Sequence, residues 1–574
     1  MRKRIVLLIV IFMSCLLAGL ELEAKVELEK LEAENGQLTG VHIETKHKGY
    51  SGSGYVSGFD NEGDRLELSF ESENEGKQRL MIGYSGPYGD KNNRVYFNGE
   101  NLGDLLFPAS AGFTEIDAGT VMLKKGSNSI VIEKSWGWFE VDYFRLADPE
   151  PPVSWNISEH PVNQAASAET RKLYDFLLDH FGKQSLAGQY VGGSKSYNDF
   201  SSEWQYLHRQ TGKYPALYGN DLMDYSPSRV EFGAKSTVTD DVIRFYNDQH
   251  GLVTLSWHWN APTDLPNTEE QPWWSGFYTR ATTFDLAAAI NDPESERYQL
   301  LLRDMDVIAA QLKRLQDKKI PVLWRPLHEA EGAWFWWGAK GPEACVKLWQ
   351  LMYERFTVHH QLNNLLWVWT TTDSPNALDW YPGDDYVDIL GVDVYLNNGD
   401  YSASASMFDR LRQLFEGKKM LTMSENGTIP DPGEMYSKEA PWLYFCTWSG
   451  DFIFDGERNS NEHLKEVFQH DSIMTLDELP DKWYQPDSTS SSKATGHATR
   501  IYPVPFQQTL HFNFSETPLW LTISDSSGRT LIERKQSELL PNTSLSMHSH
   551  PPGIYLVSYG YETAVHTLKT LKKQ

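Results

Sequence analysis

The sequence predicts an α/β protein, a central (β/α)8 TIM barrel flanked by an N-terminal β-sandwich and a small C-terminal β-sandwich. The chain has 574 residues, which is too long for one core and suits two to four domains. Strand-like and helix-like segments alternate between residues 156 and 478, whereas short apolar runs of strand type fill residues 25–147 and 500–574.

The central block carries the pattern of a parallel barrel. Apolar residues recur at helical spacing from Leu301 to Leu315, and residues 320–324 (IPVLW) follow as a buried strand. Eight such units in roughly 320 residues suit a TIM barrel, and no Gly-rich phosphate loop favours the alternative, a doubly wound open sheet. The eight candidate strands begin at Ser185, Ala216, Val253, Val322, Leu365, Asp388, Met420 and Leu443.

Two linkers separate the blocks. Residues 148–152 (DPEPP) form a stiff connection after the first β-rich block, in which residues 79–84 and 129–133 read as strands. Residues 479–499 include the polar run DSTSSS and precede the last block, where residues 519–523 alternate as a strand does.

The N-terminus has the pattern of a signal peptide, predicted as residues 1–24. Arg2, Lys3 and Arg4 precede an apolar stretch that is short for a membrane span, and a small-residue cleavage site at Ala24 follows. We therefore expect a secreted or cell-surface protein with no membrane span after cleavage. The mature chain keeps Cys345 and Cys446, too few for a disulfide framework or a zinc site.

The charge balance excludes several classes of partner. A net charge of −26 argues against nucleic acid, an anionic membrane surface and a polyanionic substrate. The chain also contains 20 tryptophans, and we expect most of them in the core and some as flat faces on which sugar rings stack.

Two glutamates stand at the carboxyl ends of predicted strands four and seven. Glu329 ends the strand 322–329, and Glu425 ends the strand 419–425. Active sites of TIM barrels lie at these strand ends, and glycoside hydrolysis needs two carboxyl groups in different protonation states. The pair therefore predicts a glycoside-cleaving site, against the alternative that each glutamate is a solvated loop residue.

Four aromatic residues, 334–337 (WFWW), follow Glu329 in a predicted loop. No single face of a strand or helix accommodates them, so we expect a substrate platform at the rim of the site, with two of the four packed inside the loop. The neighbouring His328 and Glu329 do not form a zinc-protease motif, because Gly332 occupies the position of its second histidine.

Residues 324–338 resemble the acid/base signature of glycoside hydrolase family 26, in its mannanase branch. The resemblance covers the whole central block and includes the segments 188–189 (GQ), 221–227 (DLMDYSP), 257–260 (WHWN), 273–278 (WWSGFY), 391–395 (GVDVY), 424–427 (SENG) and 447–450 (TWSG). It implies Glu329 as the acid/base and Glu425 as the nucleophile of a retaining mechanism that needs no cofactor. It also implies a substrate subsite lined by His258, His328, Trp334, Tyr395 and Trp448. Ser449 departs from the arginine of some members, which leaves distal contacts open.

Because one glutamate must be ionised and the other protonated, we predict roles for the residues around them. We expect Tyr395 and His258 to hydrogen-bond Glu425 and lower its pKa, and Trp334 to desolvate Glu329 and raise its pKa. His328 either binds the sugar 2-hydroxyl or is a buried histidine tied to the backbone.

The first block resembles a carbohydrate-binding module of family 35 in its segments 31–35 (LEAEN), 54–59 (GYVSGF) and 137–143 (GWFEVDY). The resemblance implies a structural Ca²⁺ held by Glu32, Glu34 and Asp142, whose oxygens suit a hard cation. The alternative is three unpaired surface acids. Tyr55 and Trp136 are candidate sugar platforms.

The last block resembles the C-terminal sorting domain of type IX secretion substrates. The matching segments are 501–506 (IYPVPF), 524–529 (SDSSGR), 551–557 (PPGIYLV) and 568–573 (LKTLKK). The resemblance implies the type IX secretion machinery as a partner, and a generic β-sandwich appendage is the alternative.

Together these features predict a secreted endo-β-1,4-mannanase that cleaves mannan, glucomannan or galactomannan. Two alternatives stay open. One is a β-1,3-xylanase or mixed-linkage glucanase of the same family, and the other is a non-catalytic glycan-binding protein on a barrel.

Overall fold

The computed structural model describes residues 30–572 except 152, 193–194, 375, 481–482, 484–498, 503–508, 515–516, 526–528, 541 and 561–564. The chain forms two compact units, divided between residues 485 and 486. The expected signal peptide, most of the second linker and parts of the C-terminal segments quoted above lie outside the described residues.

The N-terminal module (residues 30–147) is a sandwich of two antiparallel sheets. Alternate residues of both sheets, such as Ile82 and Ile132, are fully buried between them and form one apolar core. The first sheet contains β3 (His42–Glu44), β4 (Tyr55–Ser57), β11 (Glu140–Ala147), β6 (Gly76–Ser85) and β9 (Thr114–Leu123), with β1 (Leu31–Glu32) beside β11. The second contains β2 (Gln37–Thr39), β5 (Arg65–Ser72), β10 (Gly126–Lys134), β7 (Lys91–Phe97) and β8 (Glu100–Phe107).

The central block is a closed parallel barrel, as predicted. Neighbouring strands pair in sequence order, and β12 closes the ring by pairing with both β13 and β19. The strands are buried on both faces, which is why they appear in the sequence as continuous apolar runs. They are β12 (Ser185–Tyr190), β13 (Leu217–Asp221), β14 (Leu252–Trp257), β15 (Val322–Pro326), β16 (Leu365–Thr370), β17 (Ile389–Val394), β18 (Met420–Asn426) and β19 (Tyr444–Thr447), with β20 (Ile473–Met474) outside the ring beside β12.

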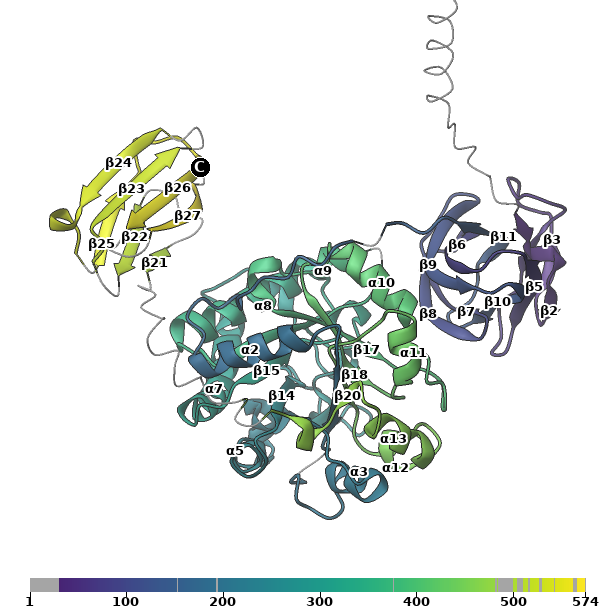
Figure 1. Cartoon of the computed structure of the whole chain (residues 1–574), viewed down its shortest axis with the longest axis horizontal. Coiled ribbons are helices and arrows are strands. Elements are labelled where there is room, and N and C mark those ends of the chain that lie inside the picture. The colour runs from purple at the N-terminus through teal and green to yellow at the C-terminus, as the bar shows by residue number, and fades with distance from the viewer. Residues whose placement is uncertain are drawn as a thin grey trace, which may run out of the picture. The chain divides into compact units, whose positions relative to one another are not determined.

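Helices surround the barrel (Figure 1). The longest, α7 (Glu296–Asp317), begins where the Ser295 hydroxyl accepts a hydrogen bond from the Tyr298 N–H at 3.2 Å. Its predicted apolar stripe, from Leu301 to Leu315, is buried against the strands. The other principal helices are α2 (Ala168–His180), α3 (Glu203–Thr211), α5 (Val238–Gln249), α8 (Pro342–Glu354), α10 (Ala405–Leu414) and α13 (Asn461–Phe468).

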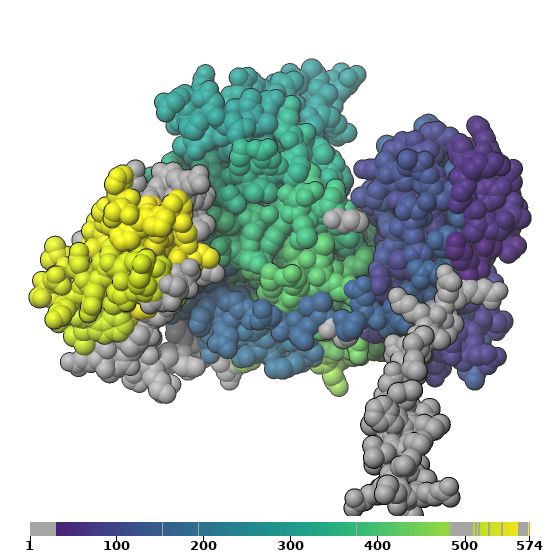
Figure 2. All heavy atoms as spheres, turned by 90° about the horizontal axis from the view of Figure 1, so that it is seen from above, coloured from purple at the N-terminus to yellow at the C-terminus, as the bar shows by residue number. Residues whose placement is uncertain are grey.

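The module and the barrel belong to the same unit. Helix α10 packs against β8 and β9 of the module, and Figure 2 shows module atoms (blue) meeting barrel atoms (green) along one side. The Lys438 ammonium of the barrel pairs with the Glu100 carboxylate of the module at 3.0 Å. The module is thus seated on the barrel by hydrogen bonds and ion pairs as well as by packing.

The C-terminal unit is a small two-sheet β-sandwich, again as predicted. Buried side chains of both sheets, including Phe512 and Ile523, share one core. One sheet contains β21 (Thr499–Tyr502), β22 (Thr509–Phe514) and β25 (Asn542–Ser546), and the other contains β24 (Thr530–Lys535), β23 (Trp520–Asp525), β26 (Gly553–Gly560) and β27 (Val565–Lys572). Among the described residues, no helix has the length and apolarity needed to cross a membrane.

Candidate active site

The two predicted glutamates meet at the carboxyl end of the barrel. Glu425 lies inside β18, whereas β15 ends at Pro326, three residues earlier than the sequence suggested. The chain then turns through Leu327 and Glu329, which have left-handed φ angles of 50° and 53°. Carboxylate oxygens of Glu329, Asp393 and Glu425 lie within 4.8 Å of one another. The left-handed φ angles of Leu327 and Glu329 are costly for residues with a side chain, and backbone strain of this kind is typical of functional sites.

A buried guanidinium binds two of the three carboxylates. Arg325 is fully buried in β15; it donates from Nη2 to Glu425 Oε2 and from Nη1 to Asp393 Oδ2, the latter at 2.8 Å. Ser424 Oγ donates to the other Asp393 oxygen at 2.8 Å. Ion pairs with two buried carboxylates keep Arg325 positively charged, and its charge in turn balances the negative charge of those carboxylates.

Glu425 receives two hydrogen bonds that favour its ionised form. Burial first and the Asp393 carboxylate second raise the pKa of Glu425 to about 8, and Glu329 adds to the rise, while Arg325 and the Tyr395 hydroxyl oppose it. The Tyr395 hydroxyl donates to Glu425 Oε1, as expected. His258 does not take the expected second role, because its Nδ1 hydrogen-bonds Asp221 Oδ2 at 2.6 Å instead.

Glu329 is in a different environment. Burial first and the Asp393 carboxylate second raise the pKa of Glu329 to about 7. Trp334 Nε1 donates to Glu329 Oε2 at 3.0 Å, and this hydrogen bond lowers that pKa, a contribution that the expectation of desolvation by Trp334 did not include. Burial is the largest cause of the raised pKa of both glutamates, so the assignment rests on their contacts: Glu425 hydrogen-bonds a cation, which favours its charged form, whereas Glu329 accepts from a neutral indole.

Two histidines, His258 and His328, belong to a further hydrogen-bonded network that begins at Asp221. Asp221 accepts from Ser256 Oγ at 2.8 Å as well as from His258. His258 Nε2 lies 3.2 Å from His328 Nε2. Burial first, then Arg325 and His258, lower the pKa of His328 well below its ordinary value, so this ring is neutral. Among the described residues its Nδ1 has no hydrogen-bond partner, so the side chain of His328 is not tied to the backbone.

The aromatic loop after Glu329 is mostly core. Phe335, Trp336 and Trp337 are buried, and only Trp334 is exposed, with 49% of its surface accessible. One exposed ring therefore replaces the expected cluster, because Trp336 Nε1 and Trp337 Nε1 both donate to backbone carbonyls that pin the loop. On another side of the site the Trp448 ring lies 5.7 Å from the His258 ring. Of the five candidate subsite residues, Trp334 and Tyr395 hydrogen-bond the two glutamates, whereas His328 and Trp448 lie against the His258 ring.

Sequence reasoning gave no role to Arg325, Asp393 or Asp221. Each lies in a strand that is otherwise apolar and buried. A charged side chain in such a strand needs a partner, and that requirement is the signal that could have identified all three.

The three acids predicted to bind a cation in the module all contact one segment, residues 51–53, but they are not among the described groups whose ligand atoms all lie within 4.8 Å of one another. Asp142 accepts from the Ser51 N–H at 2.9 Å, Glu32 accepts from Ser51 Oγ at 2.7 Å, and Glu34 accepts from the Ser53 N–H at 2.6 Å. Glu34 Oε2 is buried without a partner among the described residues. Burial is the main cause that raises the pKa of Asp142 to about 6; Ser51 opposes the rise and Glu32 adds to it. A buried, unsatisfied carboxylate oxygen beside other acids fits a hard cation.

The predicted platforms of the module have different outcomes. Tyr55 is fully buried and its hydroxyl donates to Glu44, so it offers no face to a sugar and that assignment was wrong. Trp136 is 71% exposed and remains a candidate. Trp138, which sequence reasoning did not select, is exposed as well.

Two close carboxyl groups of different protonation preference, at the open end of a (β/α)8 barrel, define a glycoside hydrolase site. Residues 162–478 match the model of glycosyl hydrolase family 26, and the chain belongs to this family. Residues 29–148 match the carbohydrate binding module of family 35, and residues 500–573 match the secretion system C-terminal sorting domain. The sorting domain indicates secretion or attachment to the cell surface.

Sequence relatives include a mannan endo-1,4-beta-mannosidase of Thermothelomyces thermophilus, 47% identical over 78% of this chain and 90% of the relative. Mannan endo-1,4-beta-mannosidase B of Piromyces sp is 35% identical over 78% of this chain and 77% of the relative. Among solved structures, the Podospora anserina GH26-CBM35 beta-(1,4)-mannanase has a TM-score of 0.56 and 43% identity, and covers 80% of this chain and 99% of that chain.

Two substitutions should shift opposite limbs of the pH–activity profile to higher pH. Tyr395→Phe removes a donor that favours ionised Glu425. The apparent pKa of the acidic limb of the kcat/KM profile should therefore increase by about half a unit to one unit. Trp334→Phe removes a donor that lowers the pKa of Glu329, so the basic limb should rise by a similar amount. Initial rates between pH 4 and 9 measure both, with Tyr381→Phe as the remote control. Unchanged apparent pKa values in both variants would contradict the proposed effect of these two hydrogen bonds.

Proposed function

We propose that the protein is an endo-β-1,4-mannanase that cleaves internal mannosidic bonds by a retaining double displacement. The separation of the Glu329 and Glu425 carboxylates supports this mechanism most directly. Retaining enzymes hold their carboxyl groups about 5 Å apart, whereas inverting enzymes need more than about 6.5 Å to admit a water. One oxygen of each carboxylate lies within 4.8 Å of one oxygen of the other, which agrees with the shorter of these two spacings.

Glu425 is the nucleophile in this proposal. Its carboxylate attacks the anomeric carbon, and Arg325 and Tyr395 keep it ionised until the bond forms. Glu329 gives its proton to the leaving oxygen at the same time. Once Glu425 has become an ester its negative charge is lost, so Glu329 ionises more readily and deprotonates the attacking water.

Five residues are proposed to hold the sugar at the cleaved bond: His258, His328, Trp334, Tyr395 and Trp448. Asp221 fixes the ring of His258 through Nδ1, so the Nε2 of neutral His258 accepts a hydrogen bond from His328. That arrangement leaves the lone pair of His328 Nδ1 as a buried acceptor without a partner among the described residues, so His328 is proposed to act on the sugar through His258.

The choice of mannan rests on the relatives, since every one of those described above is a mannanase. The enzyme should therefore release reducing ends from glucomannan and galactomannan. Its rates on xylan and lichenan should be at least about 10²-fold lower, because a site built for one arrangement of hydroxyls leaves its own polar groups unpaired when another sugar binds. Reducing-sugar assays on the four polymers measure this. Faster cleavage of xylan or lichenan would favour the alternative specificities, and no cleavage of any polymer would favour a non-catalytic glycan-binding protein.

Azide should distinguish the roles of the two glutamates. Glu329→Ala should lose about 10²- to 10⁴-fold in rate on polymer, yet still form the α-linked ester from an activated aryl β-mannobioside. Azide then attacks that ester and gives a β-glycosyl azide. Glu425→Ala forms no ester, so azide attacks the substrate directly and gives the α-anomer. NMR of the anomeric position identifies each product. Interchanged anomers would mean interchanged roles, and near-normal activity would remove that residue from the pair.

We also propose that Glu32, Glu34 and Asp142 hold a structural Ca²⁺. A cation bound only to the folded module stabilises it, so excess chelator should lower the melting temperature of the module transition by several degrees. Calorimetry of the full chain measures this shift. Glu34→Gln should abolish the response to chelator, whereas Glu62→Gln, an exposed acid of the same module, should keep it. A melting temperature that ignores chelator would reject the calcium site.

The C-terminal unit is proposed to be recognised by the type IX secretion machinery. Its two-sheet fold and its match to a sorting domain support this assignment. The residues of the proposed catalytic site all lie in the first unit.

A further inference from the structure

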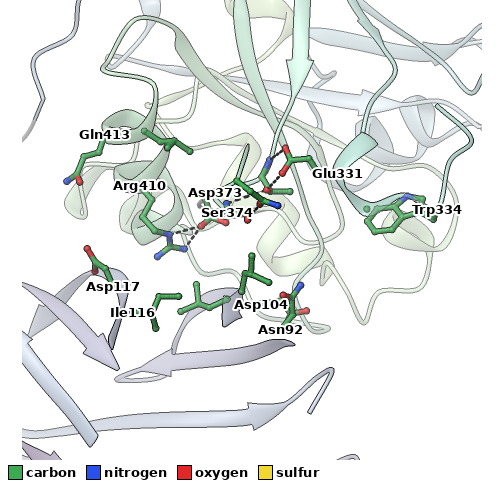
Figure 3. Close-up of a pocket in the computed structure, with 16 residues that line it drawn as sticks. Asn92, Asp104, Ile116, Asp117, Glu331, Trp334, Asp373, Ser374, Arg410 and Gln413 are labelled. Carbon is green, nitrogen blue, oxygen red and sulfur yellow. Dashed lines mark hydrogen bonds and ion pairs between the residues drawn. The ribbon is translucent and has the colours of Figure 1, made fainter. Parts of the chain in front are cut away.

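A pocket of about 540 Å³ lies beside the active site, between the barrel and the N-terminal module (Figure 3). The barrel contributes residues 331, 332 and 334, residues 372–374 and 376, and helix α10, and the module contributes residues of β7, β8 and β9. This volume falls within the range of about 300–1,000 Å³ that small-molecule sites occupy.

Specific contacts hold the module wall of the pocket in place. The Arg410 guanidinium of α10 donates to the carbonyl oxygens of Ala118, at 2.5 Å, and Leu102, at 2.9 Å. It also pairs with Asp373, with Nε 2.7 Å from Oδ2. A Cβ atom at Gly119 would lie 2.2 Å from Arg410 Nη1, so this glycine permits the close approach. The two walls are therefore joined at Arg410.

The pocket is continuous with the catalytic loop. Trp334 lines it and donates to Glu329, the proposed acid/base. Glu331, also in the lining, accepts from the Thr372 N–H at 2.9 Å and from Thr371 Oγ1 at 3.0 Å. A chain bound across the carboxylates and over Trp334 would thus reach the pocket directly.

The far wall leads to the exposed tryptophan of the module. The Trp136 N–H donates to the carbonyl oxygen of Asn92, at 2.8 Å, and Asn92 lines the pocket. Ser135 Oγ lies 3.4 Å from an oxygen of Asp104, another lining residue. The exposed indole of Trp334 therefore lines the pocket, and a second exposed tryptophan, Trp136, is joined through its backbone to the lining residue Asn92.

The lining chemistry selects a neutral polyhydroxyl ligand. Amide side chains of Asn92, Asn376 and Gln413 can both donate to and accept from hydroxyls, beside an apolar surface that includes Ile116 and Leu414. Acidic lining residues outnumber the single arginine, Arg410, which disfavours phosphates, sulfates and uronic acids. A sugar without charge satisfies both conditions.

We propose that this pocket is a distal sugar-binding subsite, completed by the module, for a residue of the same polysaccharide that is cleaved at Glu329 and Glu425. The proposal rests on the function proposed above. The sugar is either a backbone mannosyl residue beyond the catalytic subsites or a galactosyl branch, which present the same hydroxyl chemistry to the lining.

The test compares substrates that can and cannot reach the pocket. Asn92→Ala, in the module, and Gln413→Ala, in the barrel, are made singly in the full chain, with Asn74→Ala and Gln249→Ala as matched controls outside the pocket. Values of kcat/KM are measured on mannotriose, mannohexaose and galactomannan. Each pocket variant should lower the ratio of mannohexaose or galactomannan to mannotriose by roughly 3- to 10-fold, the effect of one lost hydrogen bond. The controls should keep the unaltered ratio.

The substrate arms identify the sugar. A ratio that falls with mannohexaose supports a backbone residue, and one that falls only with galactomannan supports a branch. Three outcomes would overturn the shared subsite. They are an equal loss of kcat/KM on all three substrates, unchanged ratios to the mannotriose value, and an effect of Gln413→Ala without an effect of Asn92→Ala. Thermal unfolding confirms that each variant folds. If the unaltered enzyme cleaves none of these substrates, the proposed function fails, which is a different outcome.

Discussion

The geometry of the active site depends on one buried positive charge. Arg325 projects from β15 and reaches Asp393 of β17 and Glu425 of β18, with further contacts to Tyr190 and Thr370. Three carboxylates could not be gathered in a buried site without a compensating cation. Because the guanidinium is planar and its donors are fixed, it also sets the positions of the two acids that it binds. Glu329 accepts from Trp334 rather than from Arg325, and it is the glutamate proposed to carry the proton.

The second constraint is the strained loop that presents Glu329. Left-handed φ angles at Leu327, Glu329 and Ala333 cost free energy and persist only where the surroundings fix them. The buried aromatics after Glu329 supply that restraint, since Trp337 Nε1 donates to the His328 carbonyl oxygen at 2.9 Å. A Cβ at Gly338 would lie 2.0 Å from the Ala330 carbonyl oxygen, so the loop closes tightly on itself. Only Trp334 is left exposed, where substrate can reach it.

The sequence could predict those features that depend on local pattern. Strands of a parallel barrel are apolar on both faces, so all eight were found to within a residue of their starts, and two strand-end glutamates followed from them. The partners of those glutamates could not be predicted, because closure of the barrel, and not spacing along the chain, brings Arg325 to Glu425. His258 was given Glu425 as a partner for the same reason, whereas the fold places Asp221 beside it. Tyr55 was misassigned because short β-sandwich strands do not reveal which face of an aromatic residue is covered.

The acidic network extends from the catalytic pair to the module. Glu331 follows Glu329 by two residues and accepts from Thr372, and the adjacent Asp373 pairs with Arg410, which in turn holds the backbone of β9 and β8. Each of these contacts involves a charged group, and hydrogen bonds to charged groups are stronger than those between neutral ones. Displacing the module would leave Arg410 with fewer acceptors and Asp373 more exposed to water, and Asp373 lies next to the threonine that holds Glu331. The module is therefore part of the structure that supports the loop carrying Glu329 and Glu331.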